Sequence, residues 1–336
     1  MRSDGFPFVF FGLGYPAVKV IVIGAGISGC ACAHQLVHTG HQVTVVEKGR
    51  GIGGRMATRR MEGARIDHGA QFFTTRDPRL QQLNQKWLKE EQVSPWYDRV
   101  PGRLDIPSDM RYRGKRGMTG PAKSLTQNCL LALNFFVEKI ERGKKWKVVE
   151  REGRMLEADH LVITIPSVQM LQLFERSEID LEPETMSRLQ SIRHTQCLAI
   201  LGILDRSSKL AQPGAVTHPY KDVDWLSDNQ VKGISEVPAI TLHASAEFSD
   251  QYWDIPDSEW ASELLTPAED ALDAQITSWV SHRWGFAKPL VTFGKSYYHI
   301  PELGLTLAGD GFGGERVERA AISGLDAADA ILGTKL

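Results

Sequence analysis

Two short apolar runs near the start of the chain flank a segment with helical spacing. Val18–Ile23 and Gln42–Val46 are rich in β-branched residues, which predicts two buried strands. Between them, the apolar positions of Ile27–Thr39 predict a helix that ends at Gly40. A strand, a tight turn, a helix and a second strand in this order form a right-handed βαβ unit, so we expect a parallel sheet.

Later apolar runs predict further strands. Phe135–Ile140 and Lys145–Glu150 are predicted as two strands joined by a charged turn, and Leu161–Ile165 as another strand. Leu305–Ala308 predicts a last strand, and the alanine-rich segment Glu318–Leu332 predicts a last helix. The elements of one domain are therefore expected to come from widely separated parts of the chain.

Composition places the chain among ordinary globular proteins. Apolar residues make up 42% and charged residues 24%, which excludes a disordered or collagen-like chain. The formal net charge of −2 gives no overall basic character of the kind that nucleic-acid-binding proteins show. The apolar run Phe6–Tyr15 has about ten residues, too few to span a bilayer. We therefore expect neither nucleic acid nor a membrane as a partner.

The cysteines and histidines indicate neither disulfides nor a metal. Four cysteines are too few for a disulfide scaffold. Cys30 and Cys32 lie two positions apart on a predicted helix and point about 200° from each other, so they cannot bridge. Cys129 and Cys197 belong to no C-x-x-C motif, and there is no H-E-x-x-H motif, so we expect no metal site. We expect a cytoplasmic protein.

The turn after the first predicted strand has the sequence Gly24-Ala-Gly26-Ile-Ser-Gly29. In this position G-x-G-x-x-G is typical of dinucleotide binding, because its glycines permit a tight turn, close approach of the backbone to a pyrophosphate, and packing of the helix on the strand. Glu47 ends the second strand, where a carboxylate accepts hydrogen bonds from a ribose and repels a 2′-phosphate. We therefore expect a tightly held dinucleotide other than NADP.

Two further glycine-containing segments favour a flavin dinucleotide. Gly53-Gly54-Arg55 is expected to bring a second stretch of backbone and a guanidinium to the pyrophosphate. Gly309-Asp310 follows the last predicted strand, where a carboxylate suits the hydroxyls of a ribityl chain. The helix that begins near Val317 directs its positive end toward the ring, which gains negative charge on reduction. A simple nicotinamide dehydrogenase needs neither segment.

These features predict an α/β fold in which a Rossmann-like FAD-binding domain is assembled from discontinuous segments and carries an inserted α+β substrate-binding domain. The chain has 336 residues, about twice the ~150 residues usual for one domain. All eight tryptophans except Trp146 fall in the inserted segments. The predicted bounds are 1–17 for an N-terminal extension, 18–82, 127–168 and 300–336 for the FAD-binding domain, and 83–126 and 169–299 for the substrate-binding domain.

The motifs resemble those of the flavin-containing amine oxidase superfamily and, within it, of the renalase-like oxidoreductases. The resemblance extends from about Val18 to Leu332. Besides the glycine segments, it is carried by Asp67–Phe72 and Val162–Pro166, and more weakly by Gly114–Met118, Trp225–Asn229, Leu242–Ser245 and His282–Pro289. The matching positions that the resemblance assigns to FAD are Gly24, Gly26, Ile27, Ser28, Gly29, Glu47, Lys48, Gly53, Gly54, Arg55, Gln71, Val137, Gly309, Asp310 and Val317.

The resemblance implies an oxidase that holds FAD non-covalently. Enzymes of the renalase type take hydride from dihydro isomers of NAD(P)H other than the β-4 form and pass the electrons to O2, giving NAD(P)+ and H2O2. Covalent amine oxidases carry their flavin on a cysteine shortly before the C-terminal Gly-Asp motif, whereas Cys197 precedes Gly309 by 112 residues. The lysine typical of amine oxidases is also not evident in its usual setting, which disfavours an amine substrate.

Three other functions stay open. A flavin amine oxidase acting on a small amine would need a deprotonated substrate and an aromatic cage at the flavin. A flavin-bound binding or sensing protein without turnover would be yellow, but no donor would reduce it. A protein that binds only NAD would be colourless.

Hydride transfer from a dihydropyridine needs orientation and little proton transfer, so we expect no catalytic acid–base pair. The resemblance places His243 facing the flavin and assigns Asn229 to a hydrogen bond with the substrate's carboxamide. Gln71 is expected near the flavin ring, and Arg283 and Trp284 in the wall of the nicotinamide pocket. The alternatives are a histidine satisfied within a sheet, a turn asparagine, and a tryptophan and a salt-bridged arginine in the core.

The segment Arg111–Arg116 contains four cationic residues in six. Such a segment is usually a solvated surface. Beside an active site it would instead help to hold the pyrophosphate of a dinucleotide substrate through charge-assisted hydrogen bonds.

Overall fold

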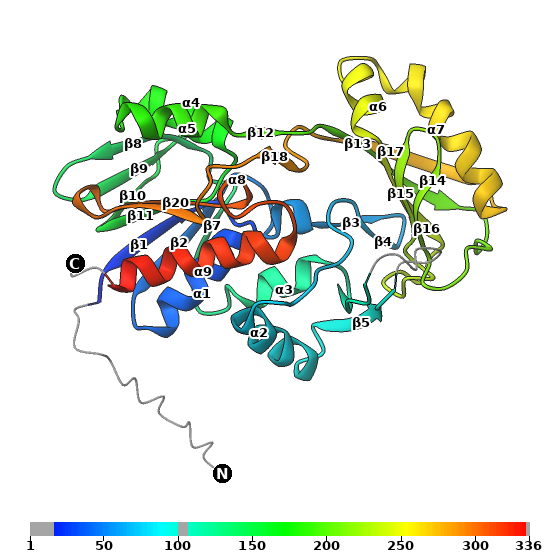
Figure 1. The fold of residues 1–336 in the computed structure, drawn as a ribbon, viewed down its shortest axis with the longest axis horizontal. Helices are drawn as coiled ribbons and strands as arrows, with labels where there is room; N and C mark the ends of the chain where they lie inside the picture. Colours follow the sequence, from blue (N-terminus) through cyan, green and yellow to red (C-terminus); the bar gives the residue numbers. More distant parts are fainter. Residues whose placement is uncertain (1–16, 100–106, 334–336) are drawn as a thin grey trace, which may run out of the picture.

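The computed structural model describes residues 17–99 and 107–333, so the predicted N-terminal extension lies outside the described residues except for its last position. The molecule has two lobes (Figure 1). The first lobe is built on a six-stranded sheet with the order β19-β20-β11-β1-β2-β7. Its strands are β1 (Lys19–Ile23), β2 (Gln42–Glu47), β7 (Leu130–Leu133), β11 (His160–Ile163), β19 (Tyr297–Ile300) and β20 (Leu305–Ala308).

The central strands of this sheet are parallel, which confirms the predicted α/β fold. Strand β1 pairs in parallel with β2 and β11, and β20 pairs in parallel with β11. Val22 of β1 is matched with Val45 on one side and Val162 on the other. Buried β-branched residues of this kind are typical of parallel strands covered on both faces. Helix α1 (Ile27–His38) connects β1 and β2 and completes the βαβ unit.

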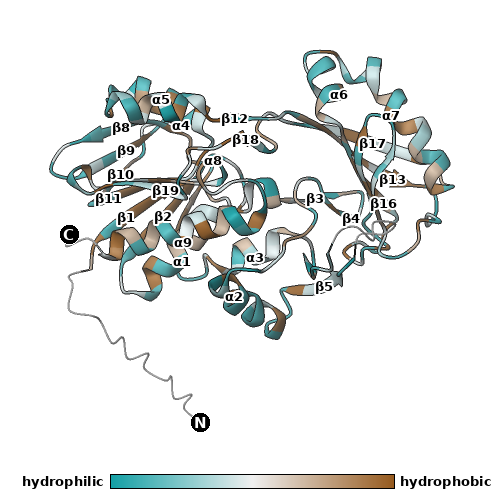
Figure 2. Ribbon diagram, viewed as in Figure 1, coloured by the Kyte–Doolittle hydropathy of each residue, from teal (hydrophilic) through white to brown (hydrophobic). Residues whose placement is uncertain are grey.

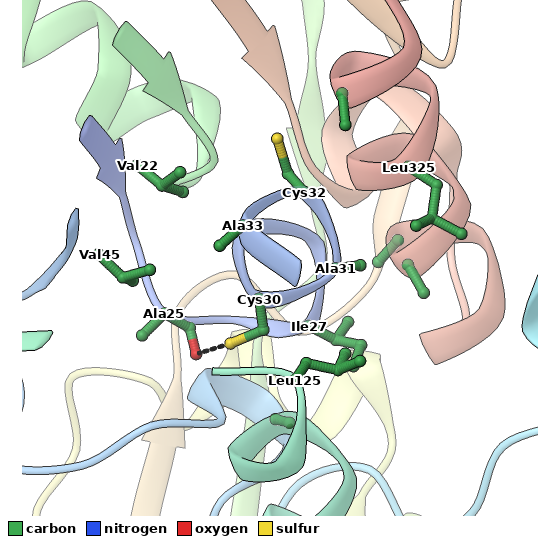
Figure 3. Packing of buried hydrophobic residues seen from close by; sticks show 14 of the residues in the cluster. Val22, Ala25, Ile27, Cys30, Ala31, Cys32, Ala33, Val45, Leu125 and Leu325 are labelled. Carbon is green, nitrogen blue, oxygen red and sulfur yellow. Dashed lines mark hydrogen bonds between the residues drawn. The ribbon is translucent and has the colours of Figure 1, made fainter. Parts of the chain in front are cut away.

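Helices α1 and α9 (Val317–Gly333) cover one face of the sheet and pack against each other. Cys30 and Cys32 point to opposite sides of α1 (Figure 3), and both are free, in agreement with the prediction that they cannot bridge. Burial raises the pKa of both thiols, which therefore serve as small packing groups. In the described parts of the chain, no helix combines the length and apolar character needed to cross a membrane.

A smaller antiparallel sheet and two helices cover the opposite face. Trp146 is fully buried there and donates from Nε1 to the carbonyl oxygens of Leu303 and Gly304 over 2.7 and 3.0 Å. The strands of the main sheet are largely brown in Figure 2, whereas the helices that cover them mix teal residues with white and brown ones. The covering elements are β8 (Val137–Arg142), β9 (Trp146–Glu150), β10 (Met155–Ala158), α4 (Ser167–Ser177) and α5 (Pro183–Ser191).

The second lobe is built on a five-stranded antiparallel sheet with the order β14-β15-β16-β13-β17. One face packs against α6 and α7, where Trp260 is fully buried. The other face is turned toward the first lobe and packs through Leu201 and Ala239 against Ile66. The elements are β13 (Cys197–Leu204), β14 (Ala215–Tyr220), β15 (Val223–Asp228), β16 (Ala239–Ala244), α6 (Ala246–Gln251), α7 (Asp257–Leu272) and β17 (Ile276–Trp284).

Two pairs of strands join the lobes. Where the chain enters and leaves the second lobe, β12 (Arg193–His194) pairs with β18 (Pro289–Val291) (Figure 1). The hairpin of β3 (Thr58–Met61) and β4 (Ala64–Asp67) reaches from the first lobe to β16. The remaining elements beside it are α2 (Pro78–Lys89), β5 (Val93–Tyr97), β6 (Arg111–Gly114) and α3 (Thr119–Ser124).

The hydrophobic cores divide the chain differently from the predicted domain bounds. Trp87 and Leu125, expected in the substrate-binding domain, share a core with α1. Met170 and Phe174, also expected there, pack on the other face of the first sheet. The five-stranded lobe therefore begins after α5. The tryptophan content of a segment does not indicate which sheet its helices cover, and this explains why the observed division differs from the predicted bounds.

Candidate functional site

A cavity of about 590 Å³ lies between the lobes. Its wall contains residues of the β1–α1 turn, the Gly53 and Gly69 turns, the start of α9 and the second-lobe sheet. The three glycine-containing segments, far apart in the sequence, meet at this cavity. The predicted site residues that line it are Gly26, Ile27, Ser28, Gly53, Arg55, Gln71, His243, Trp284, Gly309, Asp310 and Val317.

Each glycine of the β1–α1 turn has a distinct geometric reason. Gly24 has a φ of +105°, which L side chains rarely adopt. A Cβ atom at Gly29 would lie 2.1 Å from the carbonyl oxygen of Gly24, so the third glycine is required for close packing. No heavy atom lies within 4 Å of the Cβ position of Gly26, which lines the cavity. A side chain at Gly26 would occupy space that a ligand can use.

The start of α1 offers hydrogen-bond donors to the cavity. The first backbone N–H groups of a helix have no partner within it, and the described first turn of α1 contains no acidic residue. Ser28 Oγ is buried on the cavity wall without a hydrogen-bond partner. Gly53 N donates to Ala25 O over 2.9 Å and holds the second glycine segment against the turn. These groups fit the pyrophosphate of a dinucleotide.

Arg55 and Asp310, predicted to contact different parts of the cofactor, are paired with each other. Asp310 begins the short helix α8 (Asp310–Gly313), and its Oδ1 lies 2.6 Å from Arg55 Nη2, while Nη1 bonds the second oxygen. His194 Nε2 lies 3.4 Å from Asp310 Oδ2. Burial alone would raise the pKa of Asp310, but hydrogen bonding from His194 and the charge of Arg55 outweigh it and hold the pKa well below its usual range. The wall therefore carries an ionised carboxylate.

Several residues predicted to bind the cofactor do not line the cavity. Glu47 accepts hydrogen bonds from the backbone N–H groups of Ala25 (2.9 Å) and Gly49 (2.7 Å), so it links the first glycine segment to the turn that follows β2. Lys48 Nζ lies 3.2 Å from a surface glutamine oxygen. Val137 packs in the core at the start of β8. The other predicted residues outside the lining are Gly24, Gly29 and Gly54.

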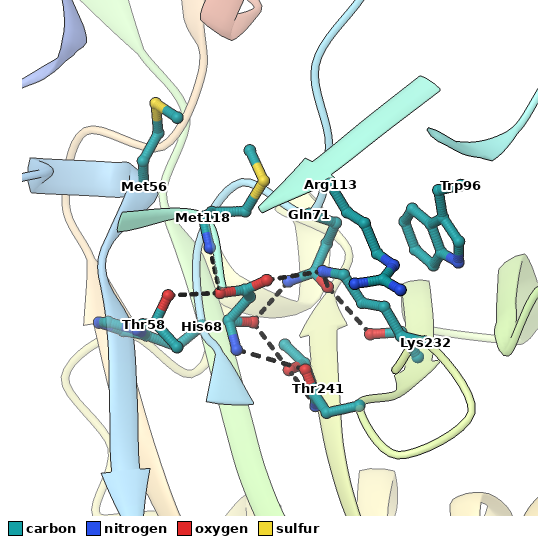
Figure 4. Close-up of polar contacts among 12 residues, drawn as sticks. Met56, Thr58, His68, Gln71, Trp96, Arg113, Met118, Lys232 and Thr241 are labelled. Carbon is teal, nitrogen blue, oxygen red and sulfur yellow. Dashed lines mark hydrogen bonds and ion pairs between the residues drawn. The ribbon is translucent and has the colours of Figure 1, made fainter. Parts of the chain in front are cut away.

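A buried ion pair lies behind the wall at the junction of the lobes (Figure 4). Lys232 Nζ lies 2.8 Å from Asp67 Oδ2, and both side chains are fully buried. Asp67 Oδ1 accepts hydrogen bonds from Thr58 Oγ1 (2.6 Å) and Met118 N (2.8 Å). Lys232 Nζ also lies 4.8 Å from the centre of a Trp96 ring. Burial lowers the pKa of Lys232, although the charge of Asp67 opposes this effect. The pair ties the second lobe to β3 and β4.

Gln71 lines the cavity, but its amide is fully used by protein groups. Its Oε1 accepts hydrogen bonds from Ser227 Oγ (3.0 Å) and Lys232 Nζ (3.1 Å). Its Nε2 donates to the carbonyl oxygens of Asp67 (2.5 Å) and Gly69 (3.0 Å). Because an amide has two donor N–H groups and two acceptor lone pairs, none remains for a ligand. Gln71 therefore shapes the wall and does not bind the flavin through its amide.

Asn229 is fully buried and does not line the cavity, contrary to the role expected for it. Its Oδ1 accepts from Asp67 N over 3.3 Å, and its Nδ2 donates to Ala239 O (3.3 Å) and Thr241 Oγ1 (3.1 Å). Asn229 is thus the turn asparagine of the alternative interpretation. It fastens the segment that leads to Gln71 onto the second-lobe sheet.

His243 and Trp284 line the cavity and share one acceptor. His243 Nε2 lies 3.0 Å from His68 O, and Trp284 Nε1 donates to the same oxygen over 2.9 Å. Since a carbonyl oxygen only accepts, Nε2 carries the proton and Nδ1 is left as an acceptor. Burial lowers the pKa of His243 to about 4, so the ring is neutral at pH 7.

Arg283, predicted beside Trp284 in the pocket wall, points to the other face of β17. It donates to the carbonyl oxygens of Trp253 (3.0 Å) and Ile255 (2.7 Å) and lies 2.6 Å from Asp257 Oδ1. Successive side chains of a strand point to opposite faces, so Trp284 and Arg283 cannot both face one cavity. The salt-bridged arginine of the alternative interpretation is what the structure shows.

Two aromatic residues that line the cavity were not among the predicted site residues. Phe72 and Trp225 line it, with ring centres 5.9 Å apart. Arg111 lines it as well, with its guanidinium carbon 5.4 Å from the centre of the Phe72 ring. Phe72 directly follows Gln71 in the sequence, whereas Trp225 is brought in by pairing with His243 across β15 and β16. That register is not visible in the sequence.

Cys197 also lines the cavity, although its sequence distance from the Gly309 motif argued against a place at the flavin. The antiparallel pairing of β13 with β16 and β17 brings it there. Burial raises the pKa of its thiol to about 12.

Known proteins resemble this chain in sequence and fold. Residues 22–87 match a family described as an NAD(P)-binding Rossmann-like domain. The chain is 22% identical to renalase of Mus musculus over 88% of this chain and 93% of renalase. It is 29% identical to a Mycobacterium tuberculosis protein named as a flavin-containing monoamine oxidase, over 56% of this chain and 42% of that protein. Its fold matches that of cyclohexylamine oxidase from Brevibacterium oxydans with a TM-score of 0.74 at 16% identity, covering 94% of this chain and 99% of that one.

Proposed function

We propose that this chain is an FAD-dependent oxidase of dihydronicotinamide nucleotides. Its motifs resemble those of the renalase-like oxidoreductases of the flavin-containing amine oxidase superfamily, and it is similar in sequence to renalase. The donors are dihydro isomers other than the β-4 form. One hydride leaves the dihydropyridine, and its two electrons reduce O2 with one further proton from solvent, giving NAD(P)+ and H2O2. The oxidoreductase class rests on the relatives, and the donor is our proposal.

The observation that supports the cofactor is the meeting of three glycine-containing segments at one cavity. FAD bound there would supply a ring that accepts hydride. The start of α1, with Gly26 and Ser28, would hold the pyrophosphate, and Arg55 and Asp310 would bind the phosphates and hydroxyls of the chain between the rings. Val317 would form part of the wall.

The polar side chains on the cavity wall favour a substrate that donates hydride. The amide of Gln71, the indole N–H of Trp284 and Nε2 of His243 are all bonded to protein groups. His243 is neutral, so it holds no proton ready for transfer at pH 7. A dihydropyridine needs only orientation, because its ring nitrogen already activates the C–H bond. These groups position a planar ring and exclude water.

The charges on the cavity wall disfavour an amine. Its described lining residues include more basic than acidic groups, namely Arg55, Arg76, Arg111, Lys288 and Arg316 against Asp224, Asp310 and Glu315. A wall of this balance repels an ammonium group and attracts a phosphate. We therefore place an amine oxidase second and a sensing protein without turnover third.

We further propose that the FAD is held non-covalently. Cys197 lies on the wall, but with a pKa of about 12 its thiol is protonated at pH 7, and the thiolate is the reactive form. Acid precipitation of the purified protein should leave the flavin absorbance in the supernatant. Flavin that stays in the washed pellet would show a covalent link.

Anaerobic stopped-flow mixing tests the proposed donor. We expect α-NADH and the isomers formed by borohydride reduction of NAD+ to bleach the flavin absorbance rapidly, and β-NADH and benzylamine to act slowly. Rapid bleaching by benzylamine alone would identify an amine oxidase. A yellow protein that no donor bleaches would be a binding or sensing protein, and a protein that takes up no FAD would overturn the cofactor as well.

A further inference from the structure

Arg111 is a buried cation on the cavity wall. Its side chain lies on β6, and the residue is only 9% exposed. Its Nη1 donates to the carbonyl oxygens of Asp98 (3.2 Å) and Asp109 (2.9 Å), while Nε is buried without a hydrogen-bond partner. The rings of Phe72 and Tyr97 lie 5.4 and 5.1 Å from its guanidinium carbon.

No carboxylate neutralises this charge within residues 17–99 and 107–333. The two aspartates that contact Arg111 do so through their backbone, and their carboxylates bond other groups, Ser108 Oγ for Asp98 and Arg76 for Asp109. A buried charge without a counter-charge is unfavourable, and aromatic faces compensate it only in part. The remaining donor capacity of the guanidinium suits an anion that enters the cavity.

Contacts along the wall place Arg111 with the second-lobe side of the cavity. Its guanidinium lies over Phe72, the Phe72 ring lies 5.9 Å from that of Trp225, and Trp225 is matched with His243 across two strands. The donors of the β1–α1 turn belong to the first-lobe sheet. Strand β6 is also firmly held, because Tyr112 and Phe73 exchange backbone hydrogen bonds of 2.8 and 2.9 Å.

We propose that Arg111 is a specificity-determining residue that binds the 5′-phosphate of the nucleotide substrate. The proposal rests on the proposed function, because it assigns a residue to that substrate. It predicts a preference for phosphorylated dihydronicotinamides, mononucleotide or dinucleotide, over the uncharged riboside. The substrate's phosphate lies at the aromatic side of the cavity, and its reactive ring lies toward His243.

The kinetic test compares two donors that differ only in the phosphate. Isomeric dihydronicotinamide mononucleotide and the matching riboside are mixed anaerobically with flavin-loaded protein. We expect the mononucleotide to bind about 10- to 100-fold more tightly than the riboside, as for a charge-assisted hydrogen bond to a buried group. Arg111→Gln should abolish this ratio, and Arg111→Lys should retain part of it.

Arg113→Gln is the matched control. Arg113 lies on the same strand and carries the same charge, but it does not line the cavity, and its Nη1 bonds Gly233 O over 3.3 Å. This variant should keep the full ratio. A wild-type protein without a preference for the mononucleotide, or an Arg111→Gln variant that keeps the preference, would overturn the proposal.

A binding experiment needs no turnover, so it tests the phosphate site separately from the oxidase activity. Calorimetric titration of the flavin-loaded protein with oxidised nicotinamide mononucleotide and nicotinamide riboside should show the same preference and the same loss in Arg111→Gln. If no dihydronicotinamide reduces the flavin but this preference persists, the oxidase proposal fails and the phosphate site stands. If Arg111→Gln instead loses its flavin while Arg113→Gln retains it, Arg111 serves the cofactor and the proposal is overturned.

Discussion

His243 and Trp284 donate to one carbonyl oxygen, that of His68, and this shared acceptor fixes what each side chain can do in the cavity. Both donors are occupied, so neither is free to donate to a substrate. Only the acceptor nitrogen of His243 remains. Burial likewise lowers the pKa of His68 to about 4. The imidazole rings of His68 and His243 beside this carbonyl are therefore neutral at pH 7.

The neutral rings predict a flat pH profile. With pKa values of about 4, His68 and His243 do not change charge between pH 6 and 9. Stopped-flow measurements should therefore find a flavin reduction rate, with a dihydronicotinamide isomer, that changes by less than about twofold over this range. An amine substrate would instead give a rate that rises as its ammonium group loses a proton. A step near pH 6.5 that disappears in His243→Asn would contradict the assigned charge state.

The buried pair of Asp67 and Lys232 predicts a strong effect on stability. Lys232→Met leaves the carboxylate of Asp67 buried without its cation, which should lower the free energy of unfolding by about 3–5 kcal/mol. The double variant Asp67→Asn/Lys232→Met should recover at least half of the loss. Urea titration of the flavin-loaded proteins measures both. Lys115→Met is the control, since Lys115 forms an exposed pair with Glu91 whose loss should change the free energy of unfolding far less. Equal losses in the two lysine variants would contradict the argument.

Some single-residue roles could be predicted and others could not. The glycines of the first turn follow from backbone geometry alone, and the structure gives each a reason. That Arg283 does not face the cavity could also have been predicted, because successive side chains of a strand point to opposite faces and Trp284 is its neighbour. It could not be predicted that protein groups use every hydrogen-bonding position of the Gln71 amide. Its partner Lys232 lies 161 residues away, and only the folded chain brings the two together.

At the scale of elements, α9 determines how α1 presents its first turn. Gly324 of α9 lies so close to α1 that a Cβ atom there would be 2.0 Å from Ser28 O. Ser28 belongs to the cavity wall. The last helix of the described chain therefore presses directly on the turn where a pyrophosphate would bind.

This contact predicts that Gly324→Ala weakens flavin retention. The added methyl group must push the helices apart, which should cost about 1–3 kcal/mol and displace the start of α1. Gly333→Ala on the same helix is the control, because nothing lies within 4 Å of its Cβ position. Thermal unfolding and the flavin-to-protein absorbance ratio should change in the first variant and not in the second. A Gly324→Ala protein with full flavin content would refute the inferred link between the helices.

Strands with a clear apolar run in the sequence could be predicted. Strands that form only because a neighbouring strand pairs with them could not. The strand over Leu305–Ala308 occurs at its expected position, and the strand predicted over Val18–Ile23 is observed over Lys19–Ile23. Strand β7 was missed because Leu130 and Leu131, its first two residues, are exposed and the run has no alternation. The pairing of β12 with β18 involves only a few residues on each side, too few for a periodic signal.

At the scale of the whole molecule, the cavity belongs to both lobes. The convergence of three glycine-containing segments could be expected from their motifs, since each is suited to the same ligand. The residues that the second lobe contributes to the cavity wall could not be predicted. They depend on the register of the five-stranded sheet and on which of its faces meets the first lobe. Trp225 and Cys197 reach the cavity only through that packing.

The buried histidines predict that the folded protein loses stability in mild acid. Burial lowers the pKa of His68 and His243 to about 4 and that of His160 to about 3, whereas the ordinary value is 6.5. Between these values the unfolded chain binds more protons than the folded one, so stability falls as pH drops from 6.5 toward 4. Each histidine should contribute a slope of up to about 1.4 kcal/mol per pH unit.

Urea unfolding at several pH values between 6.5 and 5 measures this slope. His160→Asn should reduce it by the contribution of one histidine. An unchanged slope in His160→Asn would show that the histidine is charged in the folded protein.

The order of the segments also governs when the fold can be completed during synthesis. The ribosome makes α1 early, and 278 residues separate its end at His38 from the start of α9 at Val317, the helix that packs against it. The apolar side of nascent α1 therefore stays uncovered until α9 has been synthesised. The cavity wall is likewise complete only once β20 and α9 have been made, because Gly309, Asp310 and Val317 belong to it.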